Sequence, residues 1–141
     1  MKLLLIAASL LVFAPQGDLK SIYVDHDKVA AAITGNGGNL ATGADYAISI
    51  AKRTAAGQVE IHDKETDTFY VLDGEATFIT GGTMIGGRVR SANQQVGTEI
   101  QGGTVNHLTK GDVIVIPAGM PHWFKEVPKP FTYYMVKVIK P

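Results

Sequence analysis

Residues 111–124 read GDVIVIPAGMPHWF, and this stretch decides the fold. It begins with a short apolar run of β-branched residues, which is typical of a buried strand. A Pro-x-Gly turn from Pro117 to Gly119 ends that strand, and His122 follows the turn. Pro117 fixes its own φ, and Gly119 permits a backbone conformation that other residues avoid. The turn therefore gives the His122 side chain a defined direction.

A second informative stretch, residues 57–74, reads GQVEIHDKETDTFYVLDG. Glu60 and His62 are two residues apart on an expected strand, so their side chains point to the same face. Asp67 opens the next apolar run, which we expect to be a neighbouring strand. These three side chains are potential metal ligands, and His122 is a fourth.

At these residues the chain resembles the cupin family. That family has a first motif of the form G-x5-H-x-H-x3,4-E-x6-G and a second of the form G-x5-P-x-G-x2-H-x3-N. The second motif is matched at Gly111, Pro117, Gly119 and His122, with Glu126 where the family usually has Asn.

The first motif is matched in part. His62 takes the position of the second histidine, Asp67 takes the Glu position, and Gly74 closes the motif. Glu60 stands where the first histidine is expected. The resemblance thus implies a metal site made by Glu60, His62, Asp67 and His122, with two of the four positions changed.

The resemblance also implies an all-β fold, a cupin β-barrel (double-stranded β-helix or jelly roll) of two packed antiparallel sheets. We expect residues 17–141 to form a single cupin domain with its core at 45–140. Four residues that alternate beside the two motifs are expected in or near the interior: Phe69, Val71, Val113 and Val115.

Length and charge restrict the possible functions. A chain of 141 residues fits one domain with one core. The formal net charge of zero gives no electrostatic reason to expect nucleic acid or an anionic membrane surface as a partner. Because the chain has no cysteine, a bound metal must be held by nitrogen and oxygen atoms.

Residues 1–16 resemble a secretory signal peptide, with Lys2 before an apolar run from Leu3 to Phe13. The alternative is a buried N-terminal strand or helix. The signal-peptide interpretation predicts a periplasmic or secreted protein, with no membrane span left after processing, because the run is too short to cross a bilayer comfortably.

Further elements follow from local patterns. We expect a leading strand at 19–24 and then a short helix, capped by Asp25 and ended by Gly35, with a loop at 36–39. The alternation in Tyr46–Arg53 predicts a half-buried strand.

The Gly-rich segment 81–104 predicts an inserted hairpin or a long loop between the two motifs. Both a lid over the barrel mouth and a solvated surface hairpin fit this pattern. His107 follows as an expected outward-facing residue, because Leu108 is the inward neighbour.

The last apolar stretch, Phe131–Ile139, is apolar on both faces for much of its length. This pattern predicts burial inside the sandwich or at a subunit contact, and with the resemblance it predicts a homodimer.

Two histidines with one carboxylate leave open positions on a bound ion, an arrangement that suits Fe, Mn, Ni or Zn. Asp67 is one methylene shorter than Glu, so it either binds the metal directly or orients a ligand. The alternative is a barrel that no longer binds metal.

The resemblance implies a metal-dependent enzyme, an oxygenase or an isomerase, that acts on a small molecule inside the barrel. The alternative is a non-catalytic cupin that binds a small ligand or stabilises an assembly. The sequence assigns no catalytic residue, and three side chains are candidates for a general base: Tyr70, Glu126 and Tyr133.

Overall fold

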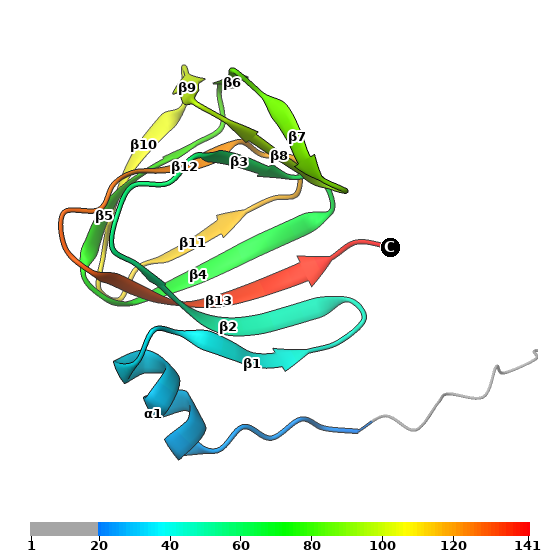
Figure 1. Cartoon of the computed structure of the whole chain (residues 1–141), viewed down its shortest axis with the longest axis vertical. Helices are drawn as coiled ribbons and strands as arrows, with labels where there is room; N and C mark the ends of the chain where they lie inside the picture. The colour runs from blue at the N-terminus through cyan, green and yellow to red at the C-terminus, as the bar shows by residue number, and fades with distance from the viewer. Residues whose placement is uncertain (1–19) are drawn as a thin grey trace, which may run out of the picture.

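The computed structural model describes residues 20–141, and the segment predicted as a signal peptide lies outside this range. Two antiparallel sheets face each other, as Figure 1 shows. In order across the first sheet, the strands are β1 (Gly38–Thr42), β2 (Tyr46–Arg53), β13 (Phe131–Ile139), β4 (Glu65–Asp73) and β11 (Val113–Ile116). The second sheet has the order β10 (Thr104–Thr109), β5 (Glu75–Thr80), β12 (His122–Glu126), β3 (Val59–His62), β8 (Gln94–Gly97) and β7 (Arg88–Ser91). The predicted all-β architecture of two packed sheets is confirmed.

An aromatic cluster fills the space between the two sheets. Its centre is formed by Phe69, Phe78, Phe124 and Phe131, each no more than 3% exposed. The rings of Phe78 and Phe124 lie 4.5 Å apart between centroids, a separation typical of packed aromatic pairs. This cluster forms the apolar core between the sheets.

The inward and outward side chains of strand β11 are exchanged relative to the prediction. Val113 and Val115 are 62% and 55% exposed, whereas Ile116 is 1% exposed. Pairing with β4 sets this register, because Ile114 lies opposite the buried Phe69 and Ile116 opposite the buried Asp67. The prediction that Val113 and Val115 are interior is therefore wrong, while Phe69 and Val71 are buried as expected.

The N-terminal helix α1 (His26–Thr34) forms as predicted. The Asp25 side chain accepts a hydrogen bond from the Lys28 N–H at 2.8 Å, and Gly35 ends the helix. The expected leading strand is absent from residues 20–24, because the edge position is taken by β1. Strand β1 begins at Gly38, inside the segment predicted as a loop and before the predicted core at residue 45.

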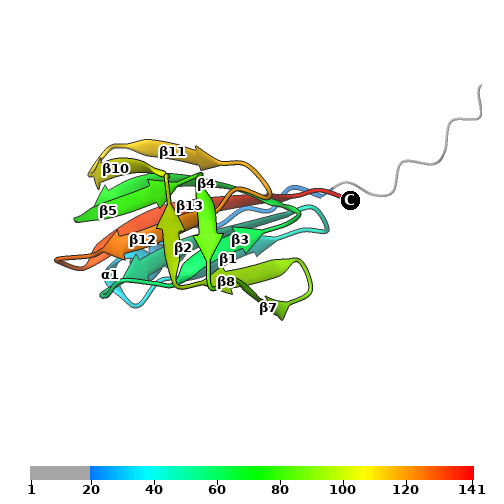
Figure 2. The ribbon, with the colours of Figure 1, turned by 90° about the horizontal axis from the view of Figure 1, so that it is seen from above.

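The Gly-rich segment 81–104 is folded rather than a long loop. It contains β6 (Thr83–Ile85) and β9 (Glu99–Gln101), which pair as a small two-stranded sheet, and the hairpin of β7 and β8. Strand β8 pairs with β3 along its full length, so this part of the insert extends the second sheet. Figure 2 shows β7 and β8 beyond β3 at one side of the molecule. The insert therefore forms a wall beside the strand that carries Glu60 and His62.

Within residues 20–141, no helix has the length and apolar character needed to cross a bilayer.

Candidate metal centre

Three of the predicted ligands converge inside the barrel. Glu60 and His62 project from β3, and His122 lies directly opposite Glu60 on the paired strand β12. One ligand atom from each of these side chains lies within 4.8 Å of the other two. Nitrogen and oxygen ligands bind divalent ions at roughly 2.0–2.2 Å, so two ligands of one ion are at most about 4.4 Å apart. The three side chains thus fit a metal ion after small rotations.

His122 has the hydrogen bond expected of a metal-binding histidine. Its side chain is 4% exposed, and Nδ1 lies 3.0 Å from the Met120 carbonyl oxygen. Because a carbonyl oxygen can only accept, this bond places the proton on Nδ1 and leaves the Nε2 lone pair for an ion. Burial lowers the pKa of His122 below 6.5, which favours this neutral form.

His62 lies beside His122, with 5.1 Å between the ring centroids. Its Nε2 is 3.7 Å from an Asp67 oxygen, and its Nδ1 is 3.7 Å from a Glu65 oxygen. Both separations exceed hydrogen-bond length, so neither carboxylate is hydrogen-bonded to a ring nitrogen of His62.

Asp67 lies inside the barrel, where it is hydrogen-bonded to Lys137. It is 2% exposed, and its two oxygens lie 3.0 and 3.2 Å from the Lys137 ammonium nitrogen. It does not belong to the three-residue group that surrounds a common point. Its contacts are those of a carboxylate that balances a lysine and lies beside His62.

Sequence analysis did not identify Lys137 as a site residue. Its ammonium also donates a 2.6 Å hydrogen bond to Glu65. Burial acts to lower the pKa of Lys137, but the Asp67 and Glu65 carboxylates outweigh it, and the net pKa lies above 10.5. One signal was available: Lys137 is the only charged residue in the apolar strand β13.

Two arginines approach Glu60, and both were also missed. A guanidinium nitrogen of Arg53 lies 3.8 Å from one Glu60 oxygen, and one of Arg90 lies 3.8 Å from the other. The Arg53 guanidinium stacks 4.3 Å from the Phe124 ring centroid and donates to the Tyr133 hydroxyl oxygen at 3.4 Å. Arg90 comes from β7, so the insert supplies a charged group to this site.

Most of these side chains line a cavity of about 220 Å³; Glu65 and Arg90 lie outside its lining. It is smaller than the roughly 300–1,000 Å³ of pockets for drug-sized ligands, and equals about seven water molecules at roughly 30 Å³ each. Its apolar floor is made by Phe69, Phe124 and Met135. The other lining residues are Arg53, Glu60, His62, Asp67, His122, Tyr133 and Lys137.

The three candidates for a general base lie in different places. Tyr133 lines the cavity, and burial raises its pKa above 10.0 although Arg53 acts in the opposite direction. Tyr70 is 45% exposed on the outer side of β4, opposite the exposed Val113. Among these three, only Tyr133 can reach a molecule in the cavity, and it would do so as a protonated hydroxyl.

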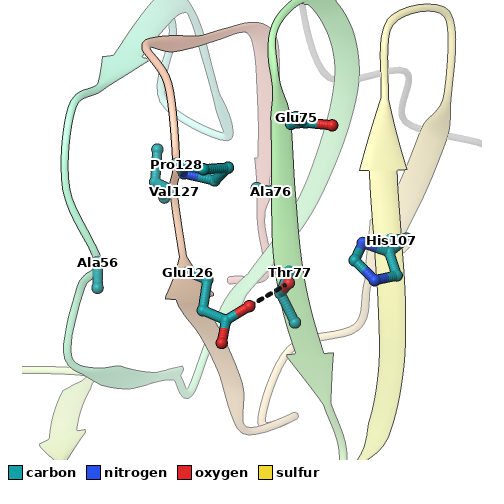
Figure 3. A pocket seen from close by; sticks show the side chains of 8 residues that line it. All are labelled: Ala56, Glu75, Ala76, Thr77, His107, Glu126, Val127 and Pro128. Carbon is teal, nitrogen blue, oxygen red and sulfur yellow. Dashed lines mark hydrogen bonds between the residues drawn. The ribbon is translucent and has the colours of Figure 1, made fainter.

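Glu126 is exposed, and Figure 3 shows it beside Thr77 in a surface hollow. It accepts a 2.8 Å hydrogen bond from Thr77, which faces outward between the buried Ala76 and Phe78. His107 lies on the neighbouring strand opposite Thr77 and lines the same surface hollow of about 540 Å³. The expectation that His107 faces outward is confirmed, and this hollow contains none of the four predicted metal ligands.

The sequence profile of the cupin family matches residues 37–138. This chain belongs to the cupin family. The profile spans both sheets and all four predicted ligands, from β1 to β13.

Solved structures share the fold at low sequence identity. A protein of Bacillus halodurans is 16% identical with a TM-score of 0.58, and the match covers 89% of this cupin and 85% of that chain. The Cnp3 cupin domain of Schizosaccharomyces pombe is 13% identical with a TM-score of 0.54, covering 74% of this cupin and 64% of that chain. A predicted oxalate decarboxylase of Thermotoga maritima is 14% identical with a TM-score of 0.52, covering 74% and 79%. No curated protein sequence matches significantly.

Proposed function

We propose that this cupin is a metal-dependent enzyme that converts a small molecule inside the barrel, by oxygenase or isomerase chemistry. The observation that carries the proposal is the convergence of Glu60, His62 and His122 within 4.8 Å of one another in a cavity of the barrel. Two imidazoles and one carboxylate would hold Fe, Mn, Ni or Zn and leave positions for a substrate. When bound, the ion would polarise a carbonyl or enediol oxygen, or activate dioxygen.

The remaining side chains of the cavity have separate roles in this proposal. Asp67, whose charge Lys137 balances, lies 3.7 Å from His62 and would orient that ring after a small shift to hydrogen-bond length. Tyr133 donates a hydrogen bond from its hydroxyl to the substrate, because its oxygen already accepts one from Arg53. The apolar floor excludes water from the reacting atoms.

A non-catalytic binding cupin is the second candidate. The observation that favours it is the mutual pairing of the charged groups, since the lysine and both arginines lie within 4 Å of a carboxylate. In a barrel balanced in this way no ion is needed to neutralise the carboxylates, and a ligand would be held through polar contacts alone.

Metal analysis of the purified protein and titration with Fe²⁺, Mn²⁺, Ni²⁺ and Zn²⁺ separate the two candidates. The enzyme proposal predicts one tightly bound ion per chain, followed by turnover in an oxygen-uptake and isomerisation screen of small organic acids, phenols and sugars. A chain that binds none of the four ions would favour the binding role. Asp67→Asn should weaken metal binding by about ten- to a hundredfold if Asp67 only orients His62, and as severely as Glu60→Gln if it binds directly.

We also propose that the chain is exported to the periplasm or secreted, with residues 1–16 as its signal peptide. Mass spectrometry of the protein from its native cell should find a mature chain that starts between Pro15 and Asp18. An intact Met1 in the cytoplasmic fraction would contradict export.

A further inference from the structure

Two arginines face the carboxylate of Glu60, a cavity-lining residue: Arg53 also lines the cavity, and Arg90 approaches Glu60 from β7. The Arg53 and Arg90 guanidinium groups each lie 3.8 Å from an oxygen of Glu60, which is beyond hydrogen-bond length. Their side chains are 28% and 56% exposed, so both border solvent. Among the described residues, Arg53 donates a side-chain hydrogen bond only to Tyr133, and Arg90 donates none. Most of their N–H donors are thus available to an incoming molecule.

The charges around the cavity become unbalanced once a metal binds. The permanent cations are Arg53, Arg90 and Lys137, and the carboxylates that face them within 4 Å are Glu60, Asp67 and Glu65. A divalent ion adds two positive charges to this balanced set and takes the Glu60 carboxylate as its own ligand. The guanidinium groups then lack the anion that they faced.

We infer that the substrate of this site is a small carboxylic acid, whose carboxylate is bound by Arg53 and Arg90 while another of its oxygens reaches the ion. Guanidinium groups present paired donors that match the two oxygens of a carboxylate. The cavity of about 220 Å³ suits a short acid. This inference rests on the proposed metal centre, and it names the substrate class of that same site.

The inference also gives the Gly-rich insert a role. Arg90 lies on β7, and β8 holds that strand against β3, which carries Glu60. The insert therefore places one recognition residue beside Glu60, while Arg53 comes from the other sheet at the end of β2. Two sheets contribute one arginine each, and the acid would bind between them.

The test uses isothermal titration calorimetry on the full chain, loaded with whichever of Fe²⁺, Mn²⁺, Ni²⁺ and Zn²⁺ binds it most tightly. The probes are pyruvate and lactate, each compared with its neutral amide, pyruvamide and lactamide. Both acids should bind at least tenfold more tightly than their amides. Arg53→Gln and Arg90→Gln should each reduce acid affinity by about tenfold and leave metal content unchanged, as expected for the loss of one charge-assisted contact.

Arg88→Gln is the matched control, because Arg88 is on the same strand as Arg90, loses the same charge and forms no ion pair among the described residues. It should bind the acids as the unmodified chain does. Arg53 packs on Phe124, so Arg53→Lys is a second variant that keeps the charge and loses the paired donors; it should also bind the acids more weakly.

Acids that bind no better than their amides, or not at all, to a chain with normal metal content would overturn the inference and leave the metal proposal intact. An equal loss in Arg88→Gln would also overturn it, since net charge alone would then explain the effect. If the chain binds no metal, the proposed function itself is refuted, and metal analysis shows this before any acid is added.

Discussion

Lys137 sets the charge balance at the inner end of the site. Its ammonium bonds both oxygens of Asp67, a carboxylate that is 2% exposed. Lys137→Met would leave this carboxylate buried without a partner, and the free energy of unfolding should fall by about 3 kcal/mol. Denaturant titration measures the loss, and the double variant Lys137→Met/Asp67→Asn should recover much of it.

Lys129→Met is the control for this prediction, since Lys129 lies 3.9 Å from Glu75 with its side chain 75% exposed. An exposed pair of this kind contributes less than about 1 kcal/mol. Equal losses in the two lysine variants would show that the Asp67–Lys137 pair has no special importance.

Tyr133 should make the protein less stable in alkali. Burial raises the pKa of Tyr133 in the folded chain above its unfolded value of 10.0. The phenol therefore ionises at a lower pH in the unfolded chain than in the folded chain. Its contribution to the free energy of unfolding is complete below pH 10 and is lost as pH rises through the folded pKa. In denaturant titrations from pH 8 to 11, Tyr133→Phe should lose less stability above pH 10 than the parent. The exposed Tyr70→Phe should follow the parent curve, and an equally steep Tyr133→Phe curve would refute burial of the phenol as the cause.

At the residue scale, the sequence could identify the ligands but not their charge partners. His122 follows a turn with a fixed geometry, and Glu60 and His62 share a face by strand alternation, so local rules were enough to find them. Lys137 is 70 residues from Asp67 in sequence, and Arg53 lies on β2, in the opposite sheet from Glu60. Strand order in the barrel brings these cations to the cavity, and local sequence rules do not determine strand order.

At the element scale, two glycine turns allow the hairpin geometry to be tested. Gly74 and Gly111 have φ values of +85° and +94°, in the left-handed region that favours glycine. A Cβ at Gly74 would collide with the Pro130 carbonyl oxygen, whereas nothing lies within 4 Å of a Cβ at Gly111. Gly111→Ala should lower the free energy of unfolding by about 1–2 kcal/mol because of the strained backbone conformation alone. Gly74→Ala should cost at least about 1 kcal/mol more because of the collision. Thermal unfolding of the two variants compares them, and equal costs would contradict this description of the turn.

Strand β11 shows why the buried face of a strand can be predicted wrongly. Its sequence, Val-Ile-Val-Ile, is apolar on both faces, so alternation alone gives no reason to choose between the valines and the isoleucines. Pairing with β4 makes that choice, because a shift of one residue would exchange the two faces. The Gly-rich insert was hard to interpret for a related reason: its short strands are defined by pairing, β6 with β9 and β8 with both β7 and β3, and not by a local pattern.

At the scale of the whole molecule, the outer side of the first sheet carries exposed apolar groups. Val113, Val115 and Val138 are each more than half exposed, and Tyr70 is 45% exposed. The homodimer prediction began from the apolar strand β13, which lies between β2 and β4 in that sheet. We expect this outer side to pair with a second copy, since apolar sheet surfaces gain stability when covered.

Light scattering should therefore give the mass of two chains, and Val115→Lys should give the mass of one while circular dichroism stays unchanged. Val105→Lys introduces the same charge at a residue that is 60% exposed on β10 of the other sheet, and it should remain dimeric. A single-chain mass for the unmodified protein at high concentration would refute the dimer.

The metal content of purified protein tests the central claim most directly. The parent chain should hold one divalent ion, measured by elemental analysis after reconstitution and gel filtration. His62→Ala and His122→Ala should each lose most of it, because they supply the two nitrogen ligands of the three-residue group. His107→Ala removes a histidine on the outer surface and should keep the full content. Full metal content in His62→Ala and His122→Ala, or a loss in His107→Ala, would contradict the metal centre in the barrel.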